Sequence, residues 1–169
     1  MIGSAFINKI MARVLTPALR DIGFTKFKGR MSWRYFEDHL WVFQLKSVGA
    51  QFSQVTGFPP ASLTANLSIF YKDFPDTPPA DVDTDGQLIP KEYLCQVRYT
   101  LDNVQDQTAL RSAQMLPMER NRKDVWWIEP DGSNAEAALE DIKKALLEVG
   151  LPLLQKPYNE RSAQLRRRS

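Results

Sequence analysis

One stretch of the sequence matches the ligand spacing of a calcium-binding loop. It reads Asp81-Val-Asp83-Thr-Asp85-Gly86, and a glutamate follows after five more residues. Calcium prefers clustered carboxylate and carbonyl oxygens, and this spacing is the EF-hand pattern. A metal site here, either for binding calcium or for metal-dependent catalysis, would use Asp81, Asp83, Asp85, the Gln87 carbonyl and Glu92.

The residues on either side of this loop argue against an EF-hand, which needs a helix before and after the loop. The preceding stretch contains Pro75, Pro78 and Pro79, and Pro90 stands where the exiting helix would begin. Proline lacks an amide donor and disrupts a helix interior. We therefore favour an acidic, solvated turn and assign no metal and no cofactor, with the metal-dependent enzyme or calcium module as the alternative.

Cys95 and His39 are the only residues of their types, so neither an intramolecular disulfide nor an ordinary zinc site can form. Reactive thiols need accessible, electropositive surroundings, whereas Cys95 falls on an apolar strand face with Val97 and Tyr99. We expect a buried, inert thiol, and a solvated His39 in a turn. The chain has no glycine-rich phosphate loop and no serine elbow, so no catalytic residue is assigned.

Polar residues alternate with apolar residues along several predicted strands, which predicts a sheet with one polar face. Arg98 falls on that face, and Trp127 must point away from its core-facing neighbour Trp126. An exposed tryptophan beside an arginine is typical of binding hot spots. The partner-binding candidates are Arg98, Trp127, Lys46 and Asn66 on this face, and Asp81, Asp83 and Asp85 as an acidic surface for a basic partner.

A structural role is the alternative for the two residues at the centre of this hypothesis. In that case Trp127 packs beneath the 72–90 loop, and Arg98 pairs with Asp124 and holds two strands together.

The period of the apolar residues predicts the elements that position these groups. Helical spacing indicates one helix over residues 4–22, with a kink or a break near residues 14–16 because of Pro17. A second helix has Ser133 as its cap, with Glu136 as the capping partner, and ends at Gly150 and Pro152. Strands are expected at 30–36, 40–46, 63–71, 95–101 and 125–128. No strand-helix-strand repeat occurs, so we expect an α+β fold: an antiparallel sheet of about five strands with the N-terminal and C-terminal helices on one face.

The length of 169 residues suits a single domain, which we place at residues 1–160. The formal net charge is +2, but four arginines against one glutamate put +3 into residues 160–169 and leave −1 for the rest. This nearly neutral body argues against nucleic-acid binding through the sheet face and the basic tail at 161–169, which we expect to be disordered. A lone cysteine fits a reducing cytoplasm, and no apolar run suits a signal peptide or a membrane span.

Several local signatures resemble DUF4304, a bacterial family of domains of unknown function. They are Ile22-Gly23-Phe24-x-x-x-x-Gly29, Gln44-Leu45-Lys46-Ser47, Cys95-x-x-Arg98, Asp124-x-Trp126-Trp127 and Gly150-Leu151-Pro152. Some members of that family occur among bacterial conflict and toxin-immunity genes. The resemblance implies a partner-binding protein and carries over no catalytic residues. We therefore expect a cytoplasmic, non-enzymatic protein-binding domain, in an immunity or accessory role, whose protein partner docks on the open sheet face or the acidic loop.

Overall fold

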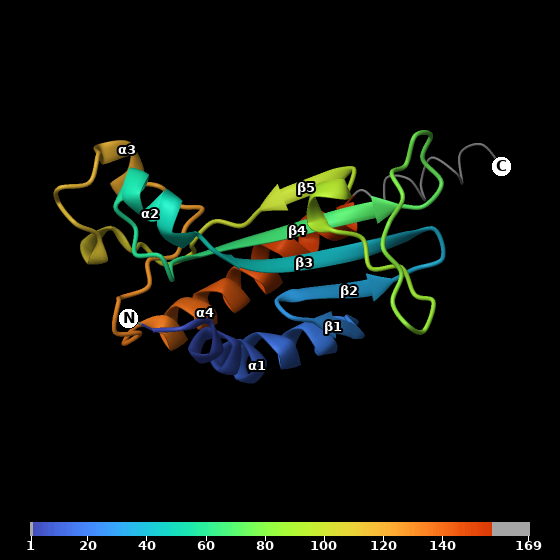
Figure 1. Ribbon diagram of the computed structural model, residues 1–169, viewed down its shortest axis with the longest axis horizontal. Helices are drawn as coiled ribbons and strands as arrows, with labels where there is room; N and C mark the ends of the chain where they lie inside the picture. The colour runs from blue at the N-terminus through green and yellow to red at the C-terminus, as the bar shows by residue number, and fades with distance from the viewer. Residues whose placement is uncertain (1, 157–169) are drawn as a thin grey trace.

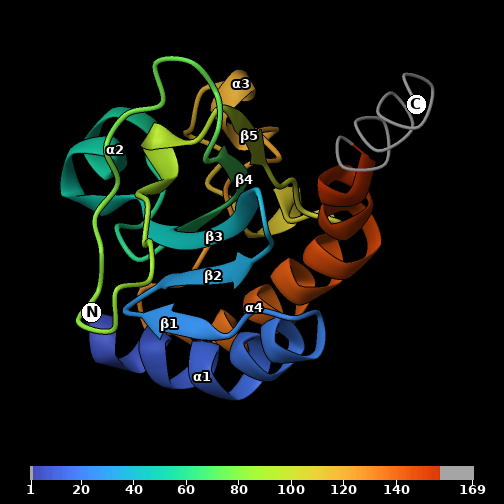
Figure 2. The ribbon, with the colours of Figure 1, turned by 90° about the vertical axis from the view of Figure 1, so that its right-hand side faces the viewer.

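An antiparallel sheet of five strands forms the middle of the protein in the computed structural model, which describes residues 2–156. The strands are β1 (Lys26–Lys28), β2 (Met31–Tyr35), β3 (His39–Ser47), β4 (Leu63–Tyr71) and β5 (Val97–Thr100), and each pairs with the next in sequence order. The helices α1 (Ser4–Asp21) and α4 (Ala135–Ala145) pack on one face of this sheet (Figures 1 and 2). The predicted α+β fold is confirmed, while the tail at 161–169 lies outside the described residues.

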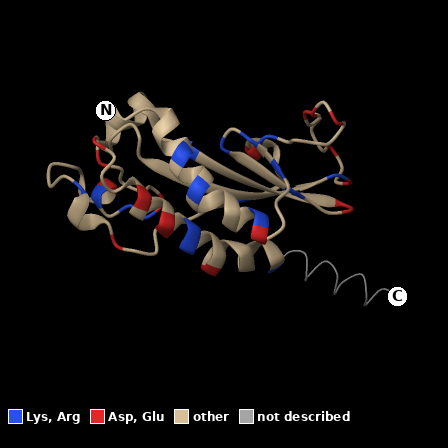
Figure 3. Cartoon of the chain, turned by 90° about the horizontal axis from the view of Figure 1, so that it is seen from below, with Lys and Arg blue, Asp and Glu red and all other residues tan. Residues whose placement is uncertain are grey.

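The main core lies between the helices and one face of the two longest strands. β3 and β4 pair over their full length, from His39 opposite Tyr71 to Ser47 opposite Leu63. Because side chains alternate between the faces of a strand, Trp41, Phe43 and Leu45 of β3 all point at the helices. On the outer side of the helices, basic and acidic residues are interspersed (Figure 3), and Arg13 of α1 pairs with Glu136 of α4 at 3.0 Å.

Both terminal helices depart from their sequence signals. α1 continues through Pro17, which is exposed to solvent, so the helix has no break there. α4 begins after Asn134 rather than Ser133 and passes into a π-helical turn, η3 (Leu146–Gly150), then into helical residues 151–156. The prediction that Gly150 ends the helix is therefore wrong. The glycine has another role, because a Cβ at this position would lie only 2.3 Å from Cδ1 of Leu67 in β4. The glycine allows helix and sheet to approach closely.

Two segments that lack a periodic pattern cover parts of the second sheet face. At one end, residues 72–96 fold over Trp33, Leu40, Val42 and Phe70 and form a smaller apolar cluster with them. The Trp33 indole nitrogen donates to the Pro90 carbonyl at 3.0 Å. This segment includes the short 3₁₀ helix η1 (Glu92–Leu94).

The opposite end of the second face carries elements that the sequence pattern did not predict. They are α2 (Gly49–Thr56) and an excursion of the chain over residues 102–124 that contains η2 (Thr108–Leu110) and α3 (Pro117–Arg120). Beyond this excursion, the predicted strand at 125–128 is reduced to one bridge between Trp126 and Leu63. None of the helices in residues 2–156 is long and apolar enough to cross a membrane.

Candidate functional site: a polar surface centred on Arg98

Arg98 is held by a buried carboxylate. Its Nε and Nη2 atoms each donate to one oxygen of Glu92 at 2.8 Å, and the hydroxyl of Ser68 donates to the same carboxylate at 3.0 Å. Glu92 is 6 % exposed, whereas the Arg98 side chain is 52 % exposed. The hydrogen bond to Glu92 raises the pKa of Arg98. The cation is therefore fixed in place and still reachable from solvent.

Three separate elements create this arrangement. Register places Arg98 of β5 directly opposite Ser68 of β4, so both side chains lie on the sheet face away from the helices. Glu92 opens η1 in the segment that folds back over that face, which brings its carboxylate to both residues. A bidentate carboxylate–guanidinium pair fixes orientation as well as position.

The surroundings of Arg98 are polar. The Thr100 hydroxyl donates to Oδ1 of Asn66 at 3.1 Å, and these residues face each other in the β4–β5 ladder. Lys46 and Thr100 are exposed, and Gln44 and Asn66 are partly buried. We refer to Gln44, Lys46, Asn66, Arg98 and Thr100 as the polar surface. It lies between the 72–96 segment and the α2–α3 end of the molecule (Figure 1).

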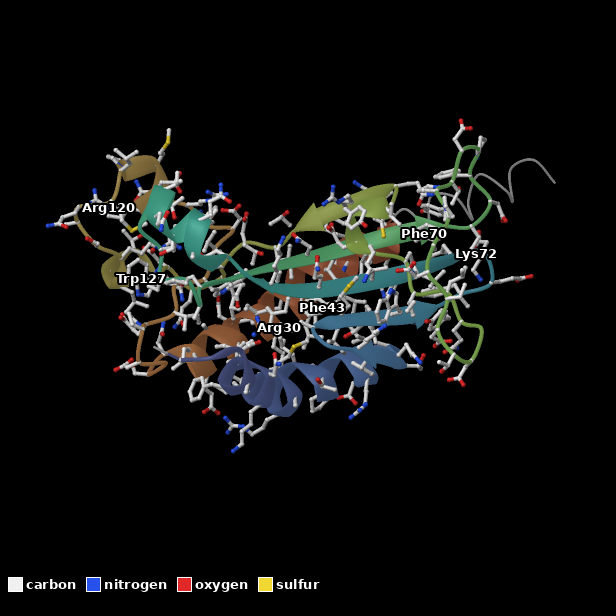
Figure 4. All side chains as sticks on the ribbon, viewed as in Figure 1. Arg30, Phe43, Phe70, Lys72, Arg120 and Trp127 are labelled. Carbon is white, nitrogen blue, oxygen red and sulfur yellow. The ribbon has the colours of Figure 1, made fainter. Side chains whose placement is uncertain are left out.

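Trp127 does not belong to this surface. Its side chain is 8 % exposed and packs with Phe58, Met115 and Val125 at the α2–α3 end (Figure 4). The hypothesis that Trp127 lies on the open face is wrong, because the 102–124 excursion and α2 cover it. Trp127 is buried, as the structural alternative expected, but it lies beneath α2 rather than the 72–90 loop. Asp124 pairs with Arg122 at 2.6 Å rather than with Arg98.

The acidic loop forms a small hairpin that the chain's own cation holds. Val82 and Leu88 form a β-bridge, and Oδ1 of Asp83 accepts the amides of Asp85 and Gln87 at 2.9 Å each. The other Asp83 oxygen lies 2.6 Å from Nζ of Lys26 in β1. The hydrogen bond to Lys26 lowers the pKa of Asp83.

Two members of the proposed calcium ligand set are thus engaged separately, Asp83 with Lys26 and Glu92 with Arg98. Asp81 and Asp85 point from an exposed turn, and Lys26 lies 3.9 Å from Asp85. Within residues 2–156, no three carboxylate, imidazole or thiol groups converge as they would around a metal ion.

Cys95 and His39 are both buried. Cys95 is 6 % exposed, and burial, followed by the nearby Glu92 carboxylate, raises its pKa to about 12. The predicted burial is confirmed, but the thiol packs with Trp33 and Phe70 on the face opposite Val97 and Tyr99. The predicted surface position of His39 is wrong: it is 2 % exposed and stacks on Phe36 with ring centres 4.3 Å apart.

A family model supports the resemblance seen in the sequence. The model of a domain of unknown function, DUF4304, matches residues 15–156. The chain belongs to the DUF4304 family. The match takes in every strand, the polar surface and the acidic loop of this DUF4304 domain. The chain has no significant match among curated proteins or among solved structures.

Two buried charges of the DUF4304 domain were not singled out from its sequence. Asp141 of α4 accepts the amides of Val104 at 3.0 Å and Gln105 at 3.1 Å, and the Trp126 indole at 2.9 Å. A signal was present, because this aspartate falls on the apolar stripe of its helix, where a charge needs a partner.

Arg111, 6 % exposed, donates to the carbonyls of Arg120, Arg122 and Val125. No local pattern marks it, because its acceptors are main-chain groups of an irregular segment. Asp141 and Arg111 together hold the 102–124 excursion in place.

Proposed function

We propose that this DUF4304 domain is a non-enzymatic protein-binding domain that receives a protein partner on the polar surface, in an immunity or accessory role in bacterial conflict. The observation that carries the proposal is the half-exposed Arg98 guanidinium fixed by the buried Glu92. Ordering a long side chain at an interface costs free energy, and Glu92 has already ordered this one before a partner arrives. Arginine is also among the residues that contribute most at protein interfaces.

Charge favours a protein partner over the two other hypotheses. The polar surface contains the cations Arg98 and Lys46, and Glu92 neutralises the first, which leaves little attraction for a phosphate backbone. In the acidic loop, Lys26 compensates Asp83, the residue at the centre of the calcium pattern. A protein partner uses mixed polar groups and a fixed arginine, and these are the groups that the surface offers.

The test measures the affinity of a partner recovered from the native host, purified and titrated against wild type and Arg98→Ala. We expect the substitution to weaken binding roughly tenfold or more, the range of an interface hot spot. Arg13→Ala on the outer side of α1 is the matched control, because it also removes an ion-paired arginine but lies in the helix layer, away from the polar surface. This control should bind like the wild type.

Arg98→Ala leaves Glu92 buried without its cation, which by itself destabilises the fold. A double variant, Arg98→Met with Glu92→Met, removes both charges and keeps apolar bulk at both positions. It should also lose the partner while melting cooperatively. Unchanged affinity in both folded variants would contradict the proposal.

A further inference from the structure

The outer edge of β5 presents backbone groups with no neighbouring strand. Within the described chain the sheet order ends at β5, and Figure 1 shows no strand beyond it. The Leu101 amide donates to the Ala65 carbonyl at 2.9 Å. This hydrogen bond shows that the odd-numbered residues of β4 direct their N–H and C=O groups toward β5. Their register partners are Val97 and Tyr99. Successive residues of an antiparallel strand direct their backbone groups to opposite sides of the strand. The N–H and C=O groups of Arg98 and Thr100 therefore point outward, away from β4.

Two copies of this edge are complementary to each other when they pair antiparallel with Tyr99 at the centre. In that register, Arg98 of one copy lies opposite Thr100 of the other, and their outward groups form backbone hydrogen bonds on both sides of the axis. Toward the helix layer, the partly buried Tyr99 meets Tyr99 of the second copy, and Val97 lies in register with Leu101, which is buried in the main core. On the other face, Arg98 lies diagonally between the exposed Asp102 and Arg98 of the second copy, and Glu92 neutralises the guanidinium in each copy. Such cross-strand pairs of aromatic, aliphatic and opposite-charge residues stabilise sheets.

The two ends of the sheet are also complementary to each other. At one end the exposed turn after β4 carries Asp73, Phe74 and Asp76. At the other end lie the exposed apolar side chains of Leu116 and Met118 and the cations Arg120 and Lys123. These ends lie far apart in one molecule (Figures 1, 3 and 4).

Antiparallel pairing of two β5 strands reverses one molecule relative to the other. It therefore sets the acidic turn of each copy beside the basic, apolar end of its neighbour.

We propose that two copies of the chain associate through their β5 edges about a two-fold axis at Tyr99, which joins the two sheets into one. An exposed strand edge readily pairs with another chain, and a two-fold contact uses every pair that lies off the axis twice. The two polar surfaces then lie side by side on the same face of the joined sheet. This association does not depend on the function proposed above.

The test is sedimentation equilibrium over a wide range of protein concentration, with Thr100→Pro and Thr100→Val as a matched pair. Both variants lose the hydroxyl that contacts Asn66, but only proline removes the outward amide of residue 100. Proline is tolerated on an edge strand when the missing amide faces away from the sheet. Wild type and Thr100→Val should shift from the chain mass of 19.4 kDa toward twice that mass as concentration rises. Thr100→Pro should associate at least roughly tenfold more weakly and melt like Thr100→Val.

A second readout follows the edge itself. In the wild type, hydrogen exchange at the amides of Arg98 and Thr100 should slow as concentration rises, and Asp102→Arg should weaken association by placing like charges on the diagonal. A wild type that stays monomeric, or a Thr100→Pro variant that associates as strongly as Thr100→Val, would overturn the proposal. A monomer that still loses a protein partner through Arg98→Ala would overturn the dimer and leave the proposed function standing.

Discussion

At the scale of single residues, most charges that sequence patterns suggest for chemistry are engaged within the fold. Asp83 illustrates this. One carboxylate oxygen closes its turn by accepting two amides, and the other binds Lys26 of β1. The acidic segment is thereby tied to the far edge of the sheet. Side chains that a calcium site would require serve instead to hold an irregular segment in place.

The pair of Asp83 and Lys26 makes a prediction about pH. Because Lys26 lowers the pKa of Asp83, the folded protein binds a proton at this site less readily than the unfolded chain does. The contribution to stability is present above the ordinary value of 3.8 and is lost as pH falls through the lowered folded value. Asp83→Asn keeps an acceptor for the turn but loses the charge, so it should be less stable than wild type at neutral pH and equal to it in acid.

Urea unfolding of both proteins at a series of pH values measures this difference. Lys28→Met in the same strand is the control, since it removes a neighbouring exposed charge and should leave the pH dependence unchanged. A gap between wild type and Asp83→Asn that stays constant into acid would contradict the prediction.

At the scale of elements, the contact between the C-terminal helix and β4 depends on one glycine. Gly150 lies at the end of the π-helical turn η3, where one turn of the helix takes in an extra residue. A Cβ there would meet Leu67 Cδ1 at 2.3 Å and Leu101 Cδ2 at 3.1 Å, and both leucines are in the main core. The close approach, rather than a positive φ, is what requires glycine at this position.

Gly150→Ala should therefore destabilise the protein by about 1–3 kcal/mol, the usual cost of overpacking a core. Leu67→Val shortens the clashing side chain, so the double variant should lose less stability than the sum of the two single losses. Unfolding free energies from urea titration measure all four proteins. Gly3→Ala is a comparison for the added Cβ, which meets nothing within 4 Å there, so its effect reports only the N-cap preference of α1. Strict additivity would show that the two residues do not clash.

At the scale of the whole molecule, one large core joins the helices to the sheet, and two smaller apolar clusters lie at opposite ends of the other face. The cluster around Trp127 is covered by the 102–124 excursion, whose buried anchors are Arg111 and Asp141. We expect this irregular segment, held by a few polar contacts, to open locally, and the core strands β3 and β4 to open only when the whole protein unfolds.

Asp141→Ala tests this division of the molecule. It leaves the amides of Val104 and Gln105 and the Trp126 indole without their acceptor, at a cost of about 2–3 kcal/mol. Hydrogen exchange should accelerate throughout residues 102–124 and much less in β3 and β4. Asp106→Ala is the matched control, since its carboxylate accepts hydrogen bonds from Thr108 in the same segment and acts on the Arg111 cation without a hydrogen bond to it. Equal acceleration in sheet and excursion would mean that the molecule opens as one unit.

The sequence by itself determined the elements whose patterns are local. The alternation in β3 and β4 has a period of two, so it specifies both the strands and the side chains that face the helices. Helical spacing likewise specified α1 and α4, and the burial of Cys95 was predicted, although the thiol packs on the face opposite the one expected. The polar side of β5 with Arg98 was predicted for the same reason.

Only the tertiary structure decided which groups meet across long stretches of chain. Residues 72–96 and 102–124 have no apolar period, so nothing local reveals that they fold back over the second sheet face. That folding buries Trp127 and gives Glu92, rather than Asp124, to Arg98. Gly150 looks like a helix stop in sequence, because its role as a point of close approach depends on Leu67, more than eighty residues earlier in the chain. Charge partners and close approaches are properties of the packed molecule, since each requires two distant segments to arrive at the same place.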